Sequence, residues 1–314
     1  MYAKIHRRCR HLSATAQPAQ GSTIVVLSDH KPGHANQSLG LAEAIQRIRP
    51  HLRIQIVDAD APARALGRIL AAAPGQLDAA MAVSAGHGTH LSLLALRRSE
   101  RCPVVVLMKP SLPHGFFDLC ITPRHDGGGE SARYWLSDGP LNRMQPGVAA
   151  EDRGVILLGG PSRHYDWDDQ RVLEQLACIA AGGERWALST SRRTPPGFLP
   201  ALRALQLPGI ELLDYEALPA GWLALELPRV QRCWVSPDSA SMVYEGLTAG
   251  CAVGLLEMRP QARSRVAGGV AALRERGLVT AFADFAAGGV LAPAATAFGE
   301  ADRCARRIVD IGWV

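Results

Sequence analysis

The chain has no Cys-x-x-Cys pair and no apolar run long enough to span a bilayer. Its seven cysteines are odd in number and scattered, mostly inside apolar segments. This distribution argues against a disulfide framework and a zinc site, and it indicates reduced, buried thiols in a cytosolic protein. The sequence also lacks a Gly-x-Gly-x-x-Gly fingerprint and a P-loop, so the common dinucleotide and nucleoside-triphosphate motifs gain no support.

Acidic residues are absent from the first twenty positions, MYAKIHRRCRHLSATAQPAQ, which also lack the apolar stretch of a secretory signal. An organellar transit peptide has a similar composition, but we expect a disordered basic tail over residues 1–21. The net charge of +5 and the pI near 9.0 are compatible with an anionic ligand or with peripheral contact at the inner face of a membrane. No nucleic-acid partner is expected.

What the chain does contain is a regular alternation of strand-like and helix-like segments. At 314 residues it has room for two domains of ordinary size. Unbroken apolar runs, each followed by a segment of helical periodicity, predict parallel β-α-β units covered on both faces. In the first half we expect strands at 23–29, 52–58, 79–86, 103–110 and 117–123, with helices at 37–48, 63–72 and 90–99. In the second half we expect strands at 154–160, 185–191, 209–215, 233–236 and 251–258, with helices at 168–181, 199–205 and 241–250.

The alternation pauses between Arg124 and Arg153, in a stretch with a Gly-Gly-Gly run and several prolines. The predicted fold class is therefore α/β, with two Rossmann-like, doubly wound parallel-sheet domains facing across a cleft. We expect an N-terminal domain over residues 22–150, a C-terminal domain over 151–296 and a closing helix over 297–314 that crosses back to the first domain.

In open parallel sheets, ligands bind beyond the carboxyl ends of the strands, so we weighed the residues placed there. LSDHKPGHANQSLG follows the first strand and brings Asp29, Lys31, Gly33 and His34 close together. Gly33 permits a tight turn, and the following helix start, with Asn36 as a candidate N-cap, offers free N–H groups. A capped turn is the plainer interpretation, but a functional loop is favoured.

Two further histidines follow strands in the first half. SAGHGTH places His87 between two glycines, and TPRHD places His125 beside an aspartate that could orient it. For His87, a structural role and a functional role are equally compatible with the sequence. Neighbouring residues seldom point the same way, so the second pair is weak evidence by itself.

In the second half, LLGGPSRHY, STSRRTP and VSPDSASMVYEG stand at strand ends. The glycine pair clears space beside backbone amides, and guanidinium groups suit phosphate oxygens. The serine-rich helix entrance adds hydroxyl donors, and Glu245 lies one turn beyond Ser241, where its carboxylate can accept both ribose hydroxyls. An ordinary N-cap by Asp238 or Ser239 is the alternative for the last motif. Together the three motifs favour a nucleoside-diphosphate site.

These motifs resemble those of the mitochondrial fission "elongated mitochondria" family, whose members are often described as candidate glycosyltransferases. The resemblance covers nearly the whole chain after about residue 22. It implies a GT-B-like fold with a nucleotide-sugar on the C-terminal domain, a donor site including Gly160, Arg192, Ser239, Ser241 and Glu245, and an acceptor side including Asp29, Lys31, Gly33, His34 and Asn36. The chain departs from the family pattern at His30, where a glycine is expected, and a positive φ there would be strained.

The full predicted donor site combines the residues that the resemblance implies with those chosen for their positions at strand ends. It consists of Gly159, Gly160, Arg192, Arg193, Asp238, Ser239, Ser241, Met242 and Glu245. The acceptor-binding residues are predicted to be Lys31, Gly33, Asn36, Gln37, His87 and His125. The predicted catalytic residues are His34 and Asp29, with His34 preferred to Asp29 as the base.

The resulting hypothesis is metal-independent glycosyl transfer from a nucleotide-diphosphate sugar, with a cell-envelope glycan or lipid as acceptor and no cofactor beyond this co-substrate. Arginines and helix amides would stabilise the departing diphosphate, and the base would deprotonate an acceptor hydroxyl. A nucleotide-sugar epimerase or hydrolase is one alternative. A non-catalytic protein that binds a membrane surface or a partner through the same fold is the other.

Overall fold

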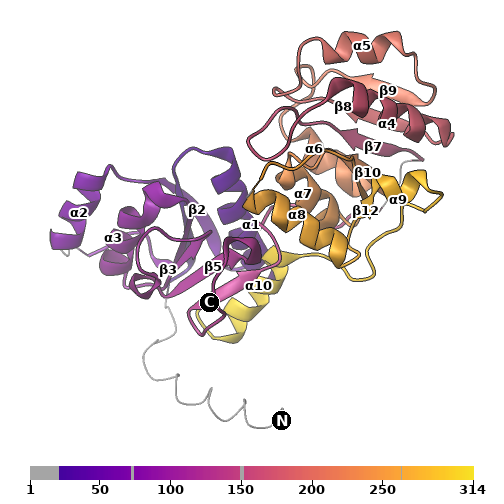
Figure 1. Ribbon diagram of the computed structural model, residues 1–314. Helices are drawn as coiled ribbons and strands as arrows, with labels where there is room; N and C mark the ends of the chain where they lie inside the picture. Colours follow the sequence, from indigo (N-terminus) through magenta and orange to yellow (C-terminus); the bar gives the residue numbers. More distant parts are fainter. Residues whose placement is uncertain (1–20, 72–73, 149–151, 263) are drawn as a thin grey trace. The chain divides into compact units, whose positions relative to one another are not determined.

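The computed structural model describes residues 21–71, 74–148, 152–262 and 264–314. These divide into two compact units (Figure 1). Unit 1 contains the chain up to Pro123, Gly127–Ser137 and Ala301–Val314, and unit 2 contains Arg124–Asp126 and Asp138–Glu300. The basic tail predicted for residues 1–21, together with Cys9, lies outside the described residues up to Gln20.

Unit 1 is built on a six-stranded parallel sheet in the order β2-β1-β3-β4-β5-β6. Its strands are β1 (Thr23–Ser28), β2 (Arg53–Asp58), β3 (Ala79–Ala85), β4 (Val104–Leu107), β5 (Leu119–Pro123) and β6 (Tyr134–Ser137). Its helices are α1 (Pro32–Ile48), α2 (Pro62–Ala71), α3 (His90–Glu100) and the short turns η3 (His87–Thr89) and η4 (His114–Phe116). The central strands β3, β4 and β5 are buried along their whole length, as expected for a sheet covered on both faces.

Helix α1 begins earlier than the sequence analysis predicted, at Pro32 and not near Asn36. Proline is well suited to the first helical position because its fixed φ is helical and its missing N–H would have no partner there. Lys31 occupies the N-cap position and its carbonyl accepts from the amides of His34 and Ala35. The prediction of Asn36 as N-cap is therefore wrong.

The last helix, α10 (Glu300–Asp310), belongs to unit 1 from Ala301 onward (Figure 1). The guanidinium of Arg307 lies 4.0 Å from the ring centroid of Trp135 in β6. Arg303 donates to the carbonyl of Leu136, and Arg47 of α1 pairs with Asp302 at 2.6 Å. A helix distant in sequence thus completes the packing around β6 and α1.

Unit 2 contains a second six-stranded parallel sheet, in the order β12-β11-β10-β7-β8-β9. Its strands are β7 (Gly154–Leu157), β8 (Trp186–Ser189), β9 (Ile210–Leu213), β10 (Arg232–Val235), β11 (Ala252–Leu255) and β12 (Thr280–Ala281). Its helices are α4 (Asp169–Ala181), α5 (Phe198–Ala204), α6 (Trp222–Glu226), α7 (Ala240–Ala249), α8 (Arg265–Glu275) and α9 (Phe282–Ala286), with short turns η5 (Arg124–Asp126) and η6 (Leu227–Arg229).

Both faces of this second sheet are buried. Along β7, Val155 and Leu157 pack into one apolar cluster, while Ile156 and the following Leu158 pack into the other. This alternation explains why the strand reads as an unbroken apolar run. The segment after β6 also belongs to unit 2, where Asn142 donates to Thr248 of α7 at 3.1 Å.

Each sheet has one point where the chain changes its direction of travel across the strands. In unit 1 this point lies between β1 and β3, and in unit 2 between β7 and β10. Ligands of doubly wound sheets bind beyond the strand ends at such switch points. The loops after β1, β3, β7 and β10 are therefore the positions to examine. Within the described residues, no helix combines the length and apolar character needed to cross a bilayer.

Candidate functional site

At the switch point of unit 1, the side chains of Asp29 and His34 are hydrogen bonded. The Nδ1 atom of His34 lies 2.9 Å from Oδ2 and 3.1 Å from Oδ1 of Asp29. Gly86, at the end of β3 with φ of 89°, leaves room for this ring, because a Cβ at position 86 would overlap His34. The two predicted catalytic residues are therefore held together by the loops after β1 and β3.

The environment of Asp29 favours its ionised form. Partial burial raises its pKa, but the hydrogen bonds from His34 and the Lys31 amide, with the nearby charges of both side chains, outweigh this and lower the pKa below 3.8. Because an ionised carboxylate can only accept, Nδ1 of His34 is the donor to Asp29, and in the neutral imidazole Nε2 is then the acceptor nitrogen. The pair can therefore act as a general base with its orienting carboxylate.

The turn that carries this pair is made by His30 and not by Gly33. His30 has a φ of 62°, the left-handed conformation that would favour glycine at this position. Gly33 lies inside α1, and a Cβ there would contact nothing within 4 Å. The tight turn that Gly33 would permit is therefore made at His30 instead. Lys31 is exposed and its ammonium lies 3.5 Å from Asp29, and Gln37 donates to the carbonyl of Gly33.

The other histidines of the first half have different surroundings. His87 is exposed on η3, and its ring centroid lies 5.8 Å from that of His90, which is buried. Burial, with a contribution from His87, lowers the pKa of His90, whose Nδ1 lies 3.1 Å from the hydroxyl of Ser111. Sequence reasoning passed over His90 and Ser111, although His90 closes the SAGHGTH motif.

His125 belongs to unit 2, not to the N-terminal domain where the sequence analysis placed it. Its ring packs against Gly269 of α8. Burial lowers the pKa of His125 despite the nearby Asp126, whose carboxylate is paired with Arg265 at 3.1 Å. Both side chains of this pair therefore contact α8.

At the switch point of unit 2, three of the predicted donor residues, Gly160, Arg193 and Asp238, form a bonded cluster. The amide of Gly160 donates to Oδ2 of Asp238 at 3.0 Å, and Arg193 Nη1 lies 2.7 Å from the same oxygen. The amide of Gly159 donates to the hydroxyl of Ser236 at 2.7 Å. A Cβ at 159 would overlap Asp238, and one at 160 would overlap the Arg193 backbone. The glycine pair thus serves close packing within the protein, and its amides are already bonded.

Asp238 is the centre of this cluster. Its side chain is fully buried, and its second oxygen, Oδ1, has no hydrogen-bond partner among the described residues. Because the carboxylate bridges the loops after β7, β8 and β10, it fixes Arg193 beside the start of α7. The sequence analysis treated Asp238 as a ligand contact or an N-cap; in the structure Ser239 occupies the N-cap position, and the Asp238 side chain links three loops.

Helix α7 begins with an uncapped turn. Ser239 occupies the N-cap position, but its side chain makes no capping hydrogen bond. Within the part of the chain that the structure describes, no hydrogen bond satisfies the amides of Ala240 and Ser241. Ser241 is exposed, and Met242 and Glu245 are partly buried on the same helix. Free amides and the helix dipole make this end suitable for an anion.

The loop after β8 is shaped by its own hydroxyls. Ser191 and Thr194 both donate to the carbonyl of Gly159, at 2.7 and 2.5 Å. They hold the turn that presents Arg192 and Arg193, both of which are exposed. The arginine pair is therefore positioned by the same β7–β8 contact that packs the glycines.

Two Asp-x-Asp triplets, a spacing that can hold a metal ion, also occur in the chain. In the first, Asp60 pairs with Arg68 at 2.8 Å, and Asp58 lies 3.4 Å from His30. In the second, Asp168 is the N-cap of α4 and accepts from the amide of Arg171. In both triplets a carboxylate is engaged by a side chain or a helix end.

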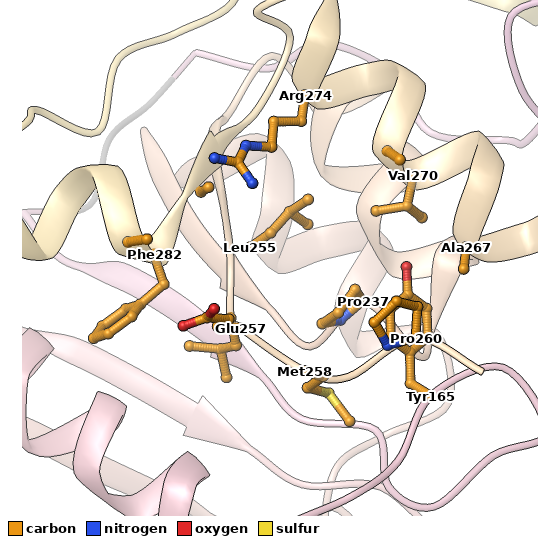
Figure 2. Close-up of a pocket in the computed structure, with 14 residues that line it drawn as sticks. Tyr165, Pro237, Leu255, Glu257, Met258, Pro260, Ala267, Val270, Arg274 and Phe282 are labelled. Carbon is orange, nitrogen blue, oxygen red and sulfur yellow. The ribbon is translucent and has the colours of Figure 1, made fainter. Parts of the chain in front are cut away.

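Unit 2 also contains a cavity of about 200 Å³ beyond the ends of β10, β11 and β12 (Figure 2). Apolar side chains from β11, α8 and α9 line most of it, including Leu255, Val270 and Phe282. Tyr165 and Pro237 contribute from the loops after β7 and β10, and Pro237 precedes the α7 entrance by two residues. Sequence reasoning did not identify this cavity, because its residues come from five separate segments.

Two doubly wound parallel sheets, with an anion-compatible helix start in the second unit, define a GT-B-like α/β fold. The same fold is found in solved structures of sugar-nucleotide enzymes. The chain belongs to the mitochondrial fission ELM1 family, whose sequence profile matches residues 32–311. The family resemblance expected from the sequence is confirmed, and so is the α/β class with two doubly wound parallel sheets.

Three structures illustrate the fold similarity. A candidate UDP-N-acetylglucosamine 2-epimerase from Listeria monocytogenes aligns with a TM-score of 0.60 at 14% identity, covering 92% of this chain and 95% of the other. The glycosyltransferase of kitacinnamycin gives 0.51 at 15% identity, covering 94% and 100%. The UDP-GlcNAc 2-epimerase from Neisseria meningitidis, bound to UDP-GlcNAc, gives 0.50 at 9% identity, covering 92% and 98%. No curated protein matches the sequence.

Proposed function

We propose that the protein is a metal-independent glycosyltransferase that uses a nucleotide-diphosphate sugar. The observation that carries this proposal is the uncapped start of α7 at the switch point of unit 2, with Arg193 fixed beside it by Asp238. A diphosphate placed there would receive the amides of Ala240 and Ser241 and the guanidinium charge. These groups would stabilise the negative charge that develops on the diphosphate as the glycosidic bond breaks.

The Asp29–His34 pair supplies the second half of the proposed reaction. His34 Nε2 would take the proton of an acceptor hydroxyl as its oxygen bonds to the anomeric carbon, and the diphosphate would leave with the bonding electrons. Glu245, on α7 beyond the phosphate position, would accept the ribose hydroxyls. The UDP-GlcNAc bound by the Neisseria epimerase supports a sugar nucleotide as the ligand class.

Binding of the nucleotide is tested first by calorimetry and thermal unfolding of the full chain with UDP, GDP, ADP and their sugars. A ligand at a hundred times its Kd raises the free energy of unfolding by about 2.7 kcal/mol. Glu245→Ala should weaken nucleotide binding about tenfold, whereas Glu216→Ala, an exposed carboxylate in the same unit, should not. Equal affinities in the two variants would remove the ribose role, and no binding to any nucleotide would contradict the proposal.

Product analysis separates the reaction classes. A transferase should release nucleoside diphosphate only when a hydroxyl acceptor is supplied. Release without an acceptor would indicate a hydrolase, and a changed sugar stereocentre would indicate an epimerase.

Unit 1 has a surface that suits an acceptor located at a membrane. Leu66 and Leu70 of α2 are 50% and 77% exposed, and Phe116 is also exposed. Arg98 and Arg101 line a concavity together with Phe116. Apolar side chains beside arginines favour peripheral contact with anionic lipids. We therefore include a lipid-linked or envelope acceptor in the proposal.

A further inference from the structure

The cavity beyond β10–β12 is too small for a whole nucleotide-sugar. Drug-sized ligands occupy about 300–1,000 Å³, and this cavity measures about 200 Å³. It can therefore hold one ring or one substituent of a larger ligand. Its walls are mainly apolar, and the two charged side chains, Glu257 and Arg274, lie on the side away from Tyr165 (Figure 2).

Those charged groups already have partners outside the cavity. Glu257 pairs with Arg171 at 3.0 Å, and Arg274 lies 3.7 Å from Asp284. The backbone of Glu257 is also fixed, since Gln175 accepts from its amide at 2.6 Å and donates to its carbonyl at 3.0 Å. The backbone just after β11 is therefore bonded to α4, and the Glu257 carboxylate also pairs with that helix.

Among the described residues that line the cavity, Tyr165 carries the polar side-chain atom that is not paired with another residue. The residue is only 6% exposed; its backbone amide donates to the hydroxyl of Ser162, and no hydrogen bond contributes to the pKa of its own hydroxyl among the described residues. Figure 2 shows this hydroxyl directed toward the cavity on the side of Ala267 and Val270. Burial, with contributions from Asp238 and Tyr244, raises the pKa of Tyr165 to about 12, so the hydroxyl remains protonated and can donate. The hydroxyl is not among the fully buried unpaired atoms, so it is accessible from the cavity and can donate to a ligand placed there.

The cavity also stands next to the proposed diphosphate position. Val235 of β10 pairs with Leu255 of β11, so the ends of the two strands are adjacent. Pro237 lines the cavity and Ser239 opens α7 two residues later. A sugar attached to a diphosphate at α7 would therefore lie near the mouth of the cavity.

We propose that this cavity binds the acetamido group of the donor sugar, and thus that the donor is a 2-acetamido sugar nucleotide. The methyl group would pack against Ala267 and Val270, and the carbonyl oxygen would accept from Tyr165. A C2 hydroxyl supplies no methyl group for the apolar walls, and its oxygen lies two bonds closer to the sugar ring than the acetamido carbonyl oxygen, away from the Tyr165 donor. The inference that the ligand is a sugar nucleotide rests on the proposed function. The inference that the cavity itself binds an acetamido group does not.

The test compares sugar nucleotides that differ only at this substituent. Dissociation constants of the full chain are measured by calorimetry for UDP, UDP-GlcNAc and UDP-Glc, and for UDP-GalNAc and UDP-Gal. One buried methyl and one hydrogen bond together should favour the acetamido member of each pair by about 10- to 200-fold. In parallel, methyl N-acetylglucosaminide without a nucleotide is examined by NMR saturation transfer to its acetyl methyl group.

Three variants locate the effect. Tyr165→Phe keeps the ring and removes the donor, and it should reduce the acetamido preference about tenfold with UDP binding unchanged. Ala267→Leu fills the cavity and should remove the preference by obstruction. Tyr134→Phe, in unit 1, makes the same chemical change away from the cavity and should leave every constant as in the wild type.

Each outcome supports or contradicts the acetamido site, the nucleotide proposal or both. Equal affinities within the pairs, with UDP bound, would overturn the acetamido site and leave the nucleotide proposal standing. Acetyl saturation that Tyr165→Phe abolishes, without nucleotide binding, would support the site and contradict the nucleotide. No signal in either arm would overturn both.

Discussion

At the scale of single residues, Asp29 and His34 form a hydrogen-bonded pair at the switch point of unit 1, with 2.9 Å between the carboxylate and the imidazole. His34→Ala should lower turnover by about 10²- to 10⁴-fold, the usual contribution of general acid–base catalysis. The Kd for the nucleotide should not change, because its proposed site is in unit 2. Rates and affinities measured on the same preparation check this, and an unaltered turnover would exclude His34 as the base.

Asp29 gives a prediction about pH and stability. Its folded pKa lies below the ordinary 3.8, so its ionised form stabilises the fold above that pH, and this contribution is lost as the pH falls through the depressed value. Asp29→Asn should lower the free energy of unfolding by about 1 kcal/mol at neutral pH and have little effect in strong acid. Urea unfolding across pH 2–7 measures it. Asp58→Asn, on an exposed aspartate at the neighbouring strand end, is the control; a pH-independent loss for Asp29→Asn would contradict the linkage.

At the scale of elements, the loop between β3 and α3 holds two glycines with different demands. Gly86 has a positive φ and faces the His34 ring, whereas a Cβ at Gly88 would contact nothing within 4 Å. Gly86→Ala should therefore lower stability by about 1–3 kcal/mol and displace His34, and Gly88→Ala should do neither. Thermal unfolding and turnover of the two variants compare them directly. Equal stability and turnover in the two variants would show that the loop adjusts to accommodate a Cβ at position 86.

The same scale shows what could be predicted from sequence. Long apolar runs and periodic helices were located correctly, since burial on both faces leaves a strong pattern. Helix α8 was missed because Gly268 and Gly269 weaken its helical signal, and β12 because it has only two residues. The prediction for α1 began too late because the Pro32 signal was not used.

The candidate site was predictable in part. Residue types at strand ends identified Asp29, His34 and the arginine pair. The position of Asp238 depends on contacts across three loops, which a linear pattern does not contain. Tyr165 was within a recognised motif, but its unpaired hydroxyl is a property of packing, not of spacing.

At the scale of the whole molecule, the exposed leucines of α2 and the arginines of α3 make a prediction about lipid. The full chain should sediment with vesicles containing phosphatidylserine and not with pure phosphatidylcholine, and salt should weaken the association. Leu66→Ser with Leu70→Ser should reduce binding to anionic vesicles, whereas Leu225→Ser, on an exposed leucine of unit 2, should not. Unchanged sedimentation of the double variant would exclude this surface.

The way the chain passes between the units bears on its biogenesis. Unit 2 ends at Glu300, while unit 1 needs the residues that follow, including the buried Cys304 and Ile308 of α10. During translation, unit 2 can therefore finish folding before unit 1, although most of unit 1 is synthesised earlier. Until α10 emerges from the ribosome, the surface of β6 and α1 that this helix covers stays exposed. A nascent chain that stops before α10 would expose this surface to chaperones.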